Sequence, residues 1–337
     1  MKIYLRLILF ICFSAIALGA SAQGDTRVSD LIKQGIELNS QKKYAEAADK
    51  YKAALAIEPD NIQANYQMAF TLFSAGKNAE ALPFIEKATH GPNPKFTAMA
   101  YSLMGSIYQG SNQLPNAVTA YQNAIKADPA NQRIYYNLGI AYFKGRFYAE
   151  AESSFEAAVK KDSSDAGSWR MYALSTFHQD KRPAALLGFC RFLMLEPNSS
   201  RSAEAFGNLQ NILSGGKLAP EPGQAKRPTE YILYYNNIVT NALTKTATRK
   251  YATPGDLLVA QLRMVFGTLY SMPTDKYYFW FALSGYFGTL ATTDNMPAFA
   301  RYISQSAKPE SAKWLKDNPD KLGALQNWIA TNRLKFL

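Results

Sequence analysis

A motif that recurs every 34 residues is the feature of this sequence that most restricts its fold. The segment from Tyr101 to Tyr108 and the segment from Tyr135 to Tyr142 both read Tyr-x-x-(Met/Leu)-Gly-x-x-Tyr, 34 residues apart. A fixed offset of this size indicates stacked repeats, because one copy is a small structural unit that cannot bury its apolar side alone. The fold is therefore expected to consist of copies that cover one another.

The offset continues in both directions along the chain. It takes Ala117 to Ala151 and Ala185, and upstream it takes Ala47 to Ala81. Between Ala81 and Ala117 the spacing is 36, because an intervening loop holds two more residues, and loops tolerate such insertions. Five consecutive copies fit this register, at residues 28–61, 62–95, 98–131, 132–165 and 166–199.

The copies resemble the tetratricopeptide repeat, whose pattern is W-x₂-L-G-x₂-Y, then A-x₃-F, then P. In the fourth copy Leu138, Gly139, Tyr142, Ala151 and Phe155 occupy the corresponding positions. Departures affect single copies, such as an alanine at the glycine position of the second and fifth copies, and leave the period unchanged. The resemblance covers about half the chain and implies an all-α fold, a solenoid of about five helix-turn-helix repeats over residues 28–199.

The residue types suit two helices packed closely in each copy. Gly105 and Gly139 leave room for the partner helix, and Phe155 fills the space between neighbouring copies. Prolines near the ends of copies stop the second helix. The last copy needs a cover, and the amphipathic segment Ser202 to Leu213 predicts a capping helix over residues 200–213.

The resemblance also implies a concave groove lined by the first helix of each copy. The lining is apolar and aromatic, with basic residues towards its C-terminal end, and aromatic and Arg side chains are typical of strong interface contacts. We therefore expect a protein partner, a peptide or helix with apolar and acidic features. The predicted partner-binding residues are Ile36, Tyr66, Phe70, Phe73, Arg133, Tyr136, Phe143, Lys144, Arg170 and Phe177.

Two qualifications apply to this groove. Ile32 and Ile36 occupy the first-copy positions at which a subset of the family holds a Lys/Asn/Arg clamp for C-terminal carboxylates, so that clamp is not expected. Alternatively, some of the aromatic side chains pack against the next copy or against the chain's own C-terminal part.

Residues 1–22 have the order of a secretory signal peptide. Lys2 and Arg6 give a positive start, residues 7–18 are apolar, and Ala-Ser-Ala at 20–22 is a cleavage site. The apolar run is short for a bilayer span. Cleavage after Ala22 predicts a periplasmic or secreted protein, and the alternative is an uncleaved membrane anchor.

The region after the repeats reads as a linker and a second helical domain. Residues 214–229 are rich in Gly and Pro, and a helical C-terminal domain is predicted over 230–337. The aromatic segment 277–283 is either a buried core helix or a contact site for a partner or a membrane surface. Helices are expected at about 253–272, 274–291, 295–306, 309–317 and 319–334.

Charge, cysteine and histidine usage narrow the function. The formal charge of +11 is weighted towards the C-terminal end without a dense Lys/Arg run, so nucleic-acid binding is not indicated, whereas peripheral association with an anionic membrane stays open. Cleavage would remove Cys12 and leave only Cys190, which we expect to be buried. His90 and His178 lack metal-site spacing. No cofactor, metal or catalytic residue is predicted.

The sequence therefore predicts a protein–protein interaction scaffold or adaptor that is not an enzyme. One alternative is a structural subunit of a cell-envelope complex, docked through the aromatic C-terminal domain. The other is an enzyme whose site lies in residues 230–337.

Overall fold

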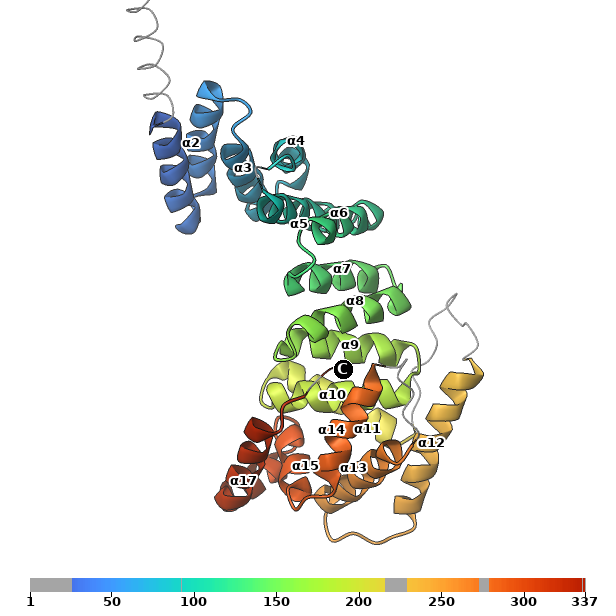
Figure 1. The fold of residues 1–337 in the computed structure, drawn as a ribbon. Coiled ribbons are helices and arrows are strands. Elements are labelled where there is room, and N and C mark those ends of the chain that lie inside the picture. The colour runs from blue at the N-terminus through green and yellow to red at the C-terminus, as the bar shows by residue number, and fades with distance from the viewer. Residues whose placement is uncertain (1–25, 92, 216–228, 273–278, 335, 337) are drawn as a thin grey trace, which may run out of the picture. The chain divides into compact units, whose positions relative to one another are not determined.

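The computed structural model describes residues 26–91, 93–215, 229–272, 279–334 and 336, and every regular element within these ranges is an α-helix (Figure 1). The chain divides into two compact units, Met1–Ala141 and Tyr142–Leu337. The predicted signal peptide, most of the predicted linker and the predicted helix start at residue 274 or 275 lie outside the described residues. The all-α fold class is confirmed.

The N-terminal unit consists of helix pairs, and their boundaries follow the predicted repeats closely. A helix over residues 26–40 precedes α2, and α7 crosses into the second unit. The main difference is that the first helix of the third pair starts at Pro94, four residues before the predicted copy, because Asn93 caps it by accepting a hydrogen bond from the Phe96 amide at 3.0 Å. The elements are α2 (Tyr44–Ile57), α3 (Ile62–Ser74), α4 (Asn78–Ala88), α5 (Pro94–Gly110), α6 (Leu114–Ala127) and α7 (Gln132–Lys144).

The turn between the two helices of every pair contains one residue in the left-handed backbone region. These residues follow the repeat spacing, and only one of them is a glycine, so the other four carry the cost of a positive φ on a residue with a Cβ atom. They are Lys42 (φ 61°), Gly76 (φ 77°), Asn112 (φ 57°), Arg146 (φ 63°) and Asp180 (φ 53°).

A second repeated interaction fixes the loop before a pair. The side chain at the fourth position of a copy donates a hydrogen bond to the carbonyl six residues earlier, although the residue type differs. Asn65 donates to Pro59 at 3.1 Å, Tyr135 donates to Pro129 at 3.1 Å, and the indole of Trp169 donates to Ser163 at 3.0 Å. Three different residue types thus donate a hydrogen bond to the equivalent loop carbonyl of three copies, which has no partner within a helix.

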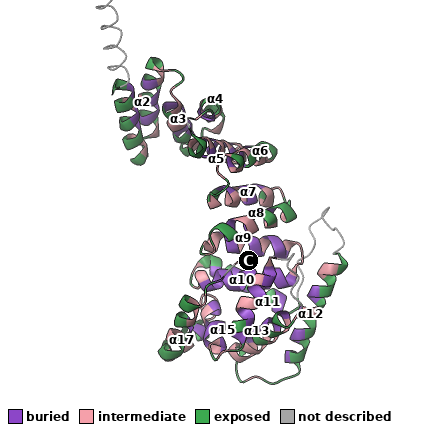
Figure 2. Ribbon diagram, viewed as in Figure 1, coloured by how far each residue is buried: buried purple, intermediate pink, exposed green. Residues whose placement is uncertain are grey.

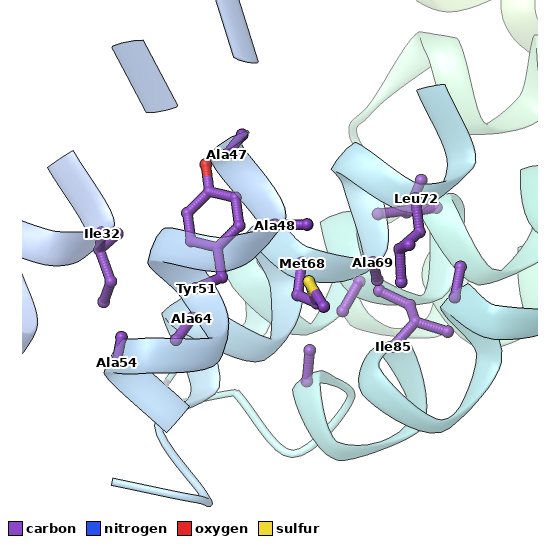
Figure 3. Packing of buried hydrophobic residues seen from close by; sticks show 14 of the residues in the cluster. Ile32, Ala47, Ala48, Tyr51, Ala54, Ala64, Met68, Ala69, Leu72 and Ile85 are labelled. Carbon is purple, nitrogen blue, oxygen red and sulfur yellow. The ribbon is translucent and has the colours of Figure 1, made fainter. Parts of the chain in front are cut away.

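The core of the N-terminal unit depends on aromatic rings lying against glycines. Figure 3 shows Tyr51 from α2 among alanines, close to the side chains that line the core. A Cβ atom added to Gly35 would lie 2.4 Å from Cε1 of Tyr51, and one added to Gly105 would lie 2.7 Å from Cε1 of Tyr121. The predicted close approach of the paired helices is therefore present, and larger residues at these glycines would push the rings out.

We predict that Gly105→Ala destabilises the N-terminal unit by about 1–3 kcal/mol, because the added methyl group overlaps the fully packed Tyr121 ring. Gly207→Ala is the control, since no atom lies within 4 Å of its added Cβ and alanine favours α11 (Ser200–Leu213) by about 1 kcal/mol. Urea unfolding followed by circular dichroism measures both. Equal effects of the two substitutions would contradict the close approach.

The C-terminal unit holds the end of α7, the second helix of the fourth repeat, the fifth repeat and the described helices after it. Described helices cover each of the predicted segments, and α12 begins at the N-cap Thr229, whose side chain accepts from the Ile232 amide. Besides α11, they are α8 (Tyr148–Lys161), α9 (Ala166–His178), α10 (Arg182–Leu195), α12 (Glu230–Ala247), α13 (Pro254–Tyr270), α14 (Trp280–Ala291), α15 (Met296–Ser304), α16 (Pro309–Asp317) and α17 (Pro319–Thr331).

Helix α10 is the centre of this unit. Every residue from Arg182 to Met194 is buried, and Figure 2 shows the helix as buried along its length. A helix that is covered all round needs neighbours on every side. The neighbours are α9, α11, α12, α14 and α15. The predicted capping helix α11 exists and packs on α10, but the helices beyond residue 230 share in covering the last repeat. The domain boundaries at 200, 214 and 230 stay a prediction.

A buried polar contact joins α12 to the turn between α9 and α10. Asn236 accepts a hydrogen bond from the backbone amide of Arg182 at 3.0 Å and donates to the carbonyl of Asp180 at 2.6 Å. Arg182 itself pairs with the Asp180 carboxylate at 3.1 Å and is almost fully buried. One amide side chain therefore satisfies two backbone groups that α12 covers.

We predict that Asn236→Ala destabilises the C-terminal unit by about 1–3 kcal/mol, because it leaves a buried amide and a buried carbonyl without partners. Asn237→Ala, at the next and exposed position, should change the stability by less than about 0.5 kcal/mol. Urea unfolding followed by tryptophan fluorescence reports on this unit alone, because all four tryptophans lie in it. Equal losses in the two variants would argue against this contact.

The aromatic segment is part of the core where it is described. Trp280, Phe281 and Leu283 of α14 are buried, and the Trp280 ring lies 5.1 Å from that of Tyr235. Residues 277 and 278 lie outside the described ranges. Among the described residues no helix combines the length and apolar character that crossing a bilayer requires. Cys190 is buried as predicted, and burial raises the pKa of its thiol well above the usual range.

Candidate functional site

The N-terminal unit exposes large apolar side chains on three successive first helices. Ile36 on the helix over residues 26–40 is 39% exposed, Phe70 on α3 is 37% exposed and Met99 on α5 is 49% exposed. Single exposed apolar side chains are common on protein surfaces, whereas apolar side chains that together form a contiguous patch mark an interaction site. Ile36 and Phe70 are among the ten predicted partner-binding residues, and Met99 is not.

The remaining predicted residues on α3 are half-buried and support the exposed ones. The ring of Tyr66 lies 5.4 Å from that of Phe96 at the start of α5, and Phe73 packs against the core. Burial raises the pKa of the Tyr66 phenol, so this ring stays neutral well above neutral pH. On α7, Arg133 is exposed and Tyr136 is half-buried.

In the C-terminal unit, Phe143 belongs to a small aromatic cluster. Its ring lies 5.3 Å from Tyr148 and 5.4 Å from His178, and the rings of Tyr148 and His178 stack at 4.5 Å. Lys144, the next residue, is exposed. This cluster joins the end of α7 to α8 and α9 and leaves only part of the Phe143 ring accessible.

Two predicted lining residues of the fifth copy are not available to a partner. Phe177 is only 7% exposed, and its ring meets that of Phe189 at 5.8 Å, so it is a core residue. Arg170 is paired with Glu204 of α11 at 2.8 Å. The structure thus places Phe177 in the core, because α9 is buried on several sides, and pairs Arg170 with an acidic residue of the same chain.

The chain's own C-terminal part covers the side of α9 that carries Trp169. The rings of Phe279 and Phe336 stack on Trp169 at 5.7 Å and 6.1 Å, and Phe279 also meets Tyr172 at 5.2 Å. Lys160 lies over the Phe279 ring at 5.4 Å. Trp169 and Tyr172 thus pack against the C-terminal part of the chain, but neither is a predicted lining residue, so the alternative for the lining aromatics stays a prediction. No local sequence signal could show it, because the contacting residues are more than a hundred positions apart.

Within the described ranges, no group of three or more His, Cys, Asp or Glu side chains could hold a metal ion. An open depression in the N-terminal unit is lined by Asp60, Ile62, Glu86, Lys87 and His90, and Lys87 and Asp60 form an ion pair at 2.9 Å across it. The feature that stands out among the described residues of this unit is therefore the set of exposed apolar side chains on its first helices.

Three segments of the chain match known repeat families. Residues 38–92 and 137–191 each match a family described as tetratricopeptide repeat, and residues 100–145 match one described as TPR repeat. The chain is a tetratricopeptide-repeat protein. The matched segments fall on the helix pairs described above and follow the same register.

Two named relatives are similar to this chain over part of its length. Over 131 residues the chain is 29% identical to tetratricopeptide repeat protein 6 of Homo sapiens, which covers 39% of this chain and 25% of that protein. Over 141 residues it is 26% identical to small glutamine-rich tetratricopeptide repeat-containing protein 2 of Mycosarcoma maydis, which covers 42% of this chain and 39% of that protein. The chain thus spans well under half the length of these relatives.

A solved structure shows the same fold. The chain from the functional characterisation of Pseudomonas aeruginosa pilF aligns with a TM-score of 0.50 at 16% identity, over 57% of this chain and 86% of that one. At this identity the likeness concerns the fold alone.

We predict that Phe177→Ala destabilises the C-terminal unit by about 3–5 kcal/mol, as expected for a buried ring. Phe147→Ala is the matched control, because Phe147 is 58% exposed in the same unit and its loss should cost less than about 1 kcal/mol. Tryptophan fluorescence during urea unfolding measures both. A loss of less than about 1 kcal/mol for Phe177 would return it to the partner-binding surface.

Proposed function

We propose that this tetratricopeptide-repeat protein is a protein–protein interaction scaffold, exported to the periplasm or secreted, that acts by binding rather than by catalysis. Its N-terminal unit binds a segment of a partner protein on the exposed side of the first helices. The repeat family supports the scaffold role, and the order of charge, apolar run and small residues in positions 1–22 supports export.

The observation that carries the proposal is the exposure of Ile36, Phe70 and Met99 at equivalent faces of successive helices. Burying such side chains against a partner releases about 25 cal/mol per Å² of apolar surface. Aromatic side chains also lose little conformational entropy on binding, since they have two rotatable bonds. In the fifth copy, by contrast, Phe177 and Trp169 are buried, and the proposal therefore places the partner on the N-terminal unit.

A second candidate role rests on the C-terminal unit. Leu233 and Tyr234 on α12 are 46% and 58% exposed, and Tyr270 at the end of α13 is 55% exposed. These side chains would suit a structural subunit that docks into a larger assembly of the cell envelope. Both roles predict a protein partner, and they differ in which unit contacts it.

The test is site-specific photo-crosslinking in the native cell. A benzophenone amino acid at position 70 is expected to give a covalent adduct with a defined partner, whereas one at position 57 is not. Ile57 is the matched control because it is 38% exposed in the same unit but lies at the end of a second helix, α2. Mass spectrometry identifies the partner, and binding of the two purified proteins confirms it.

The same experiment decides between the two roles. Adducts from position 234 without adducts from position 70 would assign the contact to the C-terminal unit and contradict the proposal. Adducts of equal yield from positions 57 and 70 would show that the first helices have no special part in binding.

A further inference from the structure

Two neighbouring first helices are almost free of charged residues. Helix α3 contains no Asp, Glu, Lys or Arg, and α5 contains only Lys95, in its first turn. The second helices α2 and α4 of the same unit carry charges at seven positions: Glu46, Asp49, Lys50, Lys52, Glu80, Glu86 and Lys87. The second helix α6, which pairs with α5, carries only Lys126, so the lack of charge covers α3, α5 and α6 and is not a property of the whole unit.

The apolar side chains of these two helices form one surface. Tyr66, Phe70 and Phe73 lie three and four residues apart and share one face of α3. Phe96 and Met99, three residues apart, share one face of α5, and the two helices are in contact where the Tyr66 ring meets the Phe96 ring at 5.4 Å. We name these five residues the α3–α5 surface.

A surface that only has to be solvated normally carries Lys and Glu at such positions. Here the exposed positions hold Phe70 and Met99 instead, together with uncharged polar residues such as Gln63 and Ser74. A carboxylate or ammonium group of a partner would lose its hydration against the five apolar side chains, and on α3 and α5 only Lys95, at the start of α5, could pair with a carboxylate. An uncharged segment has no hydrated charge to lose on binding, and the flexible Met99 side chain can adapt to the shape of that segment.

The basic residues on which an acidic partner would depend lie elsewhere. Arg133 and Lys144 are on α7, outside the α3–α5 surface, and Arg170 is already paired with Glu204. On α3 and α5 the acidic features expected from the sequence have one basic counterpart, the exposed Lys95 in the first turn of α5.

We propose that the α3–α5 surface binds an uncharged segment of a partner protein through aliphatic and aromatic side chains, without ion pairs. This inference rests on the proposed scaffold function and specifies the chemistry of the partner. Binding is then driven by burial of apolar surface, and its affinity depends little on ionic strength, since screening weakens only interactions between charges.

The test uses the purified chain without residues 1–22, the predicted signal peptide. It is mixed with a library of random peptides of about twelve residues. We expect the retained peptides to be enriched in Leu, Ile, Met, Phe and Trp and depleted in Asp and Glu. The Kd of a retained peptide should change by less than about twofold between about 50 mM and 500 mM NaCl. Enrichment of acidic residues, a loss of affinity above about tenfold over this range, or retention of no peptide would overturn the inference.

Variants locate the binding surface. Phe70→Gln and Met99→Gln should each weaken the peptide by about tenfold or more, as for residues at the centre of an interface. Phe70→Leu, which keeps an apolar side chain, should retain most of the affinity. Ile57→Gln is the control at matched exposure and should leave the Kd unchanged. Circular dichroism confirms that each variant is folded, and an unchanged Kd in both Gln variants would overturn the assignment.

The outcomes separate this inference from the scaffold function. Crosslinks from position 70 to a partner whose binding is salt-sensitive would preserve the function and overturn the neutral chemistry. Light scattering of the chain over a range of concentrations tests whether a second copy is the occupant. A dimer that dissociates on Phe70→Gln would replace the partner segment by this chain itself and overturn the proposal.

Discussion

The close approach of the two helices in each repeat is the constraint on which the rest of the structure depends. In the first and third pairs a tyrosine of the second helix lies directly against a glycine of the first, at distances that leave no room for a Cβ atom. The ring fills the space between the two helices, and the closely packed pair can then stack on the next pair. The turn that joins the two helices of each pair also contains one residue with a positive φ. The backbone conformation and the side-chain packing therefore recur with the same period.

The two units apply this arrangement differently. In the N-terminal unit the first helices keep part of their apolar side chains in solvent, at Ile36, Phe70 and Met99. In the C-terminal unit the chain continues past the last repeat, and its helices bury α10 completely while Phe279 and Phe336 cover Trp169. The C-terminal part of the chain thus covers core residues of the last repeat, whereas the N-terminal unit keeps three apolar side chains exposed on its first helices.

This difference restricts where a partner can bind. The α3–α5 surface is apolar, exposed in part and nearly free of charge, whereas the fifth copy's Phe177 lies in the core and its Arg170 faces Glu204. A scaffold needs an accessible surface and a rigid support, and the half-buried Tyr66 and Phe73 provide that support beneath Phe70. The buried contact of Asn236 with the α9–α10 turn has the opposite role, since it fixes α12 to the last repeat.

The sequence by itself determined the all-helical fold, the 34-residue repeat and the approximate bounds of most described helices after residue 250, because these depend on local residue types and their spacing. Glycine, alanine and aromatic residues at fixed spacing specify how one pair packs on the next, whatever else the chain contains. It also predicted that Ile36 and Phe70 line the groove side of the first helices, and both side chains are exposed. Only the tertiary structure decided that Phe177 is core, that Arg170 is paired and that Trp169 is covered. Those contacts join positions far apart in the chain, and no periodic pattern records which distant residue will cover a given face.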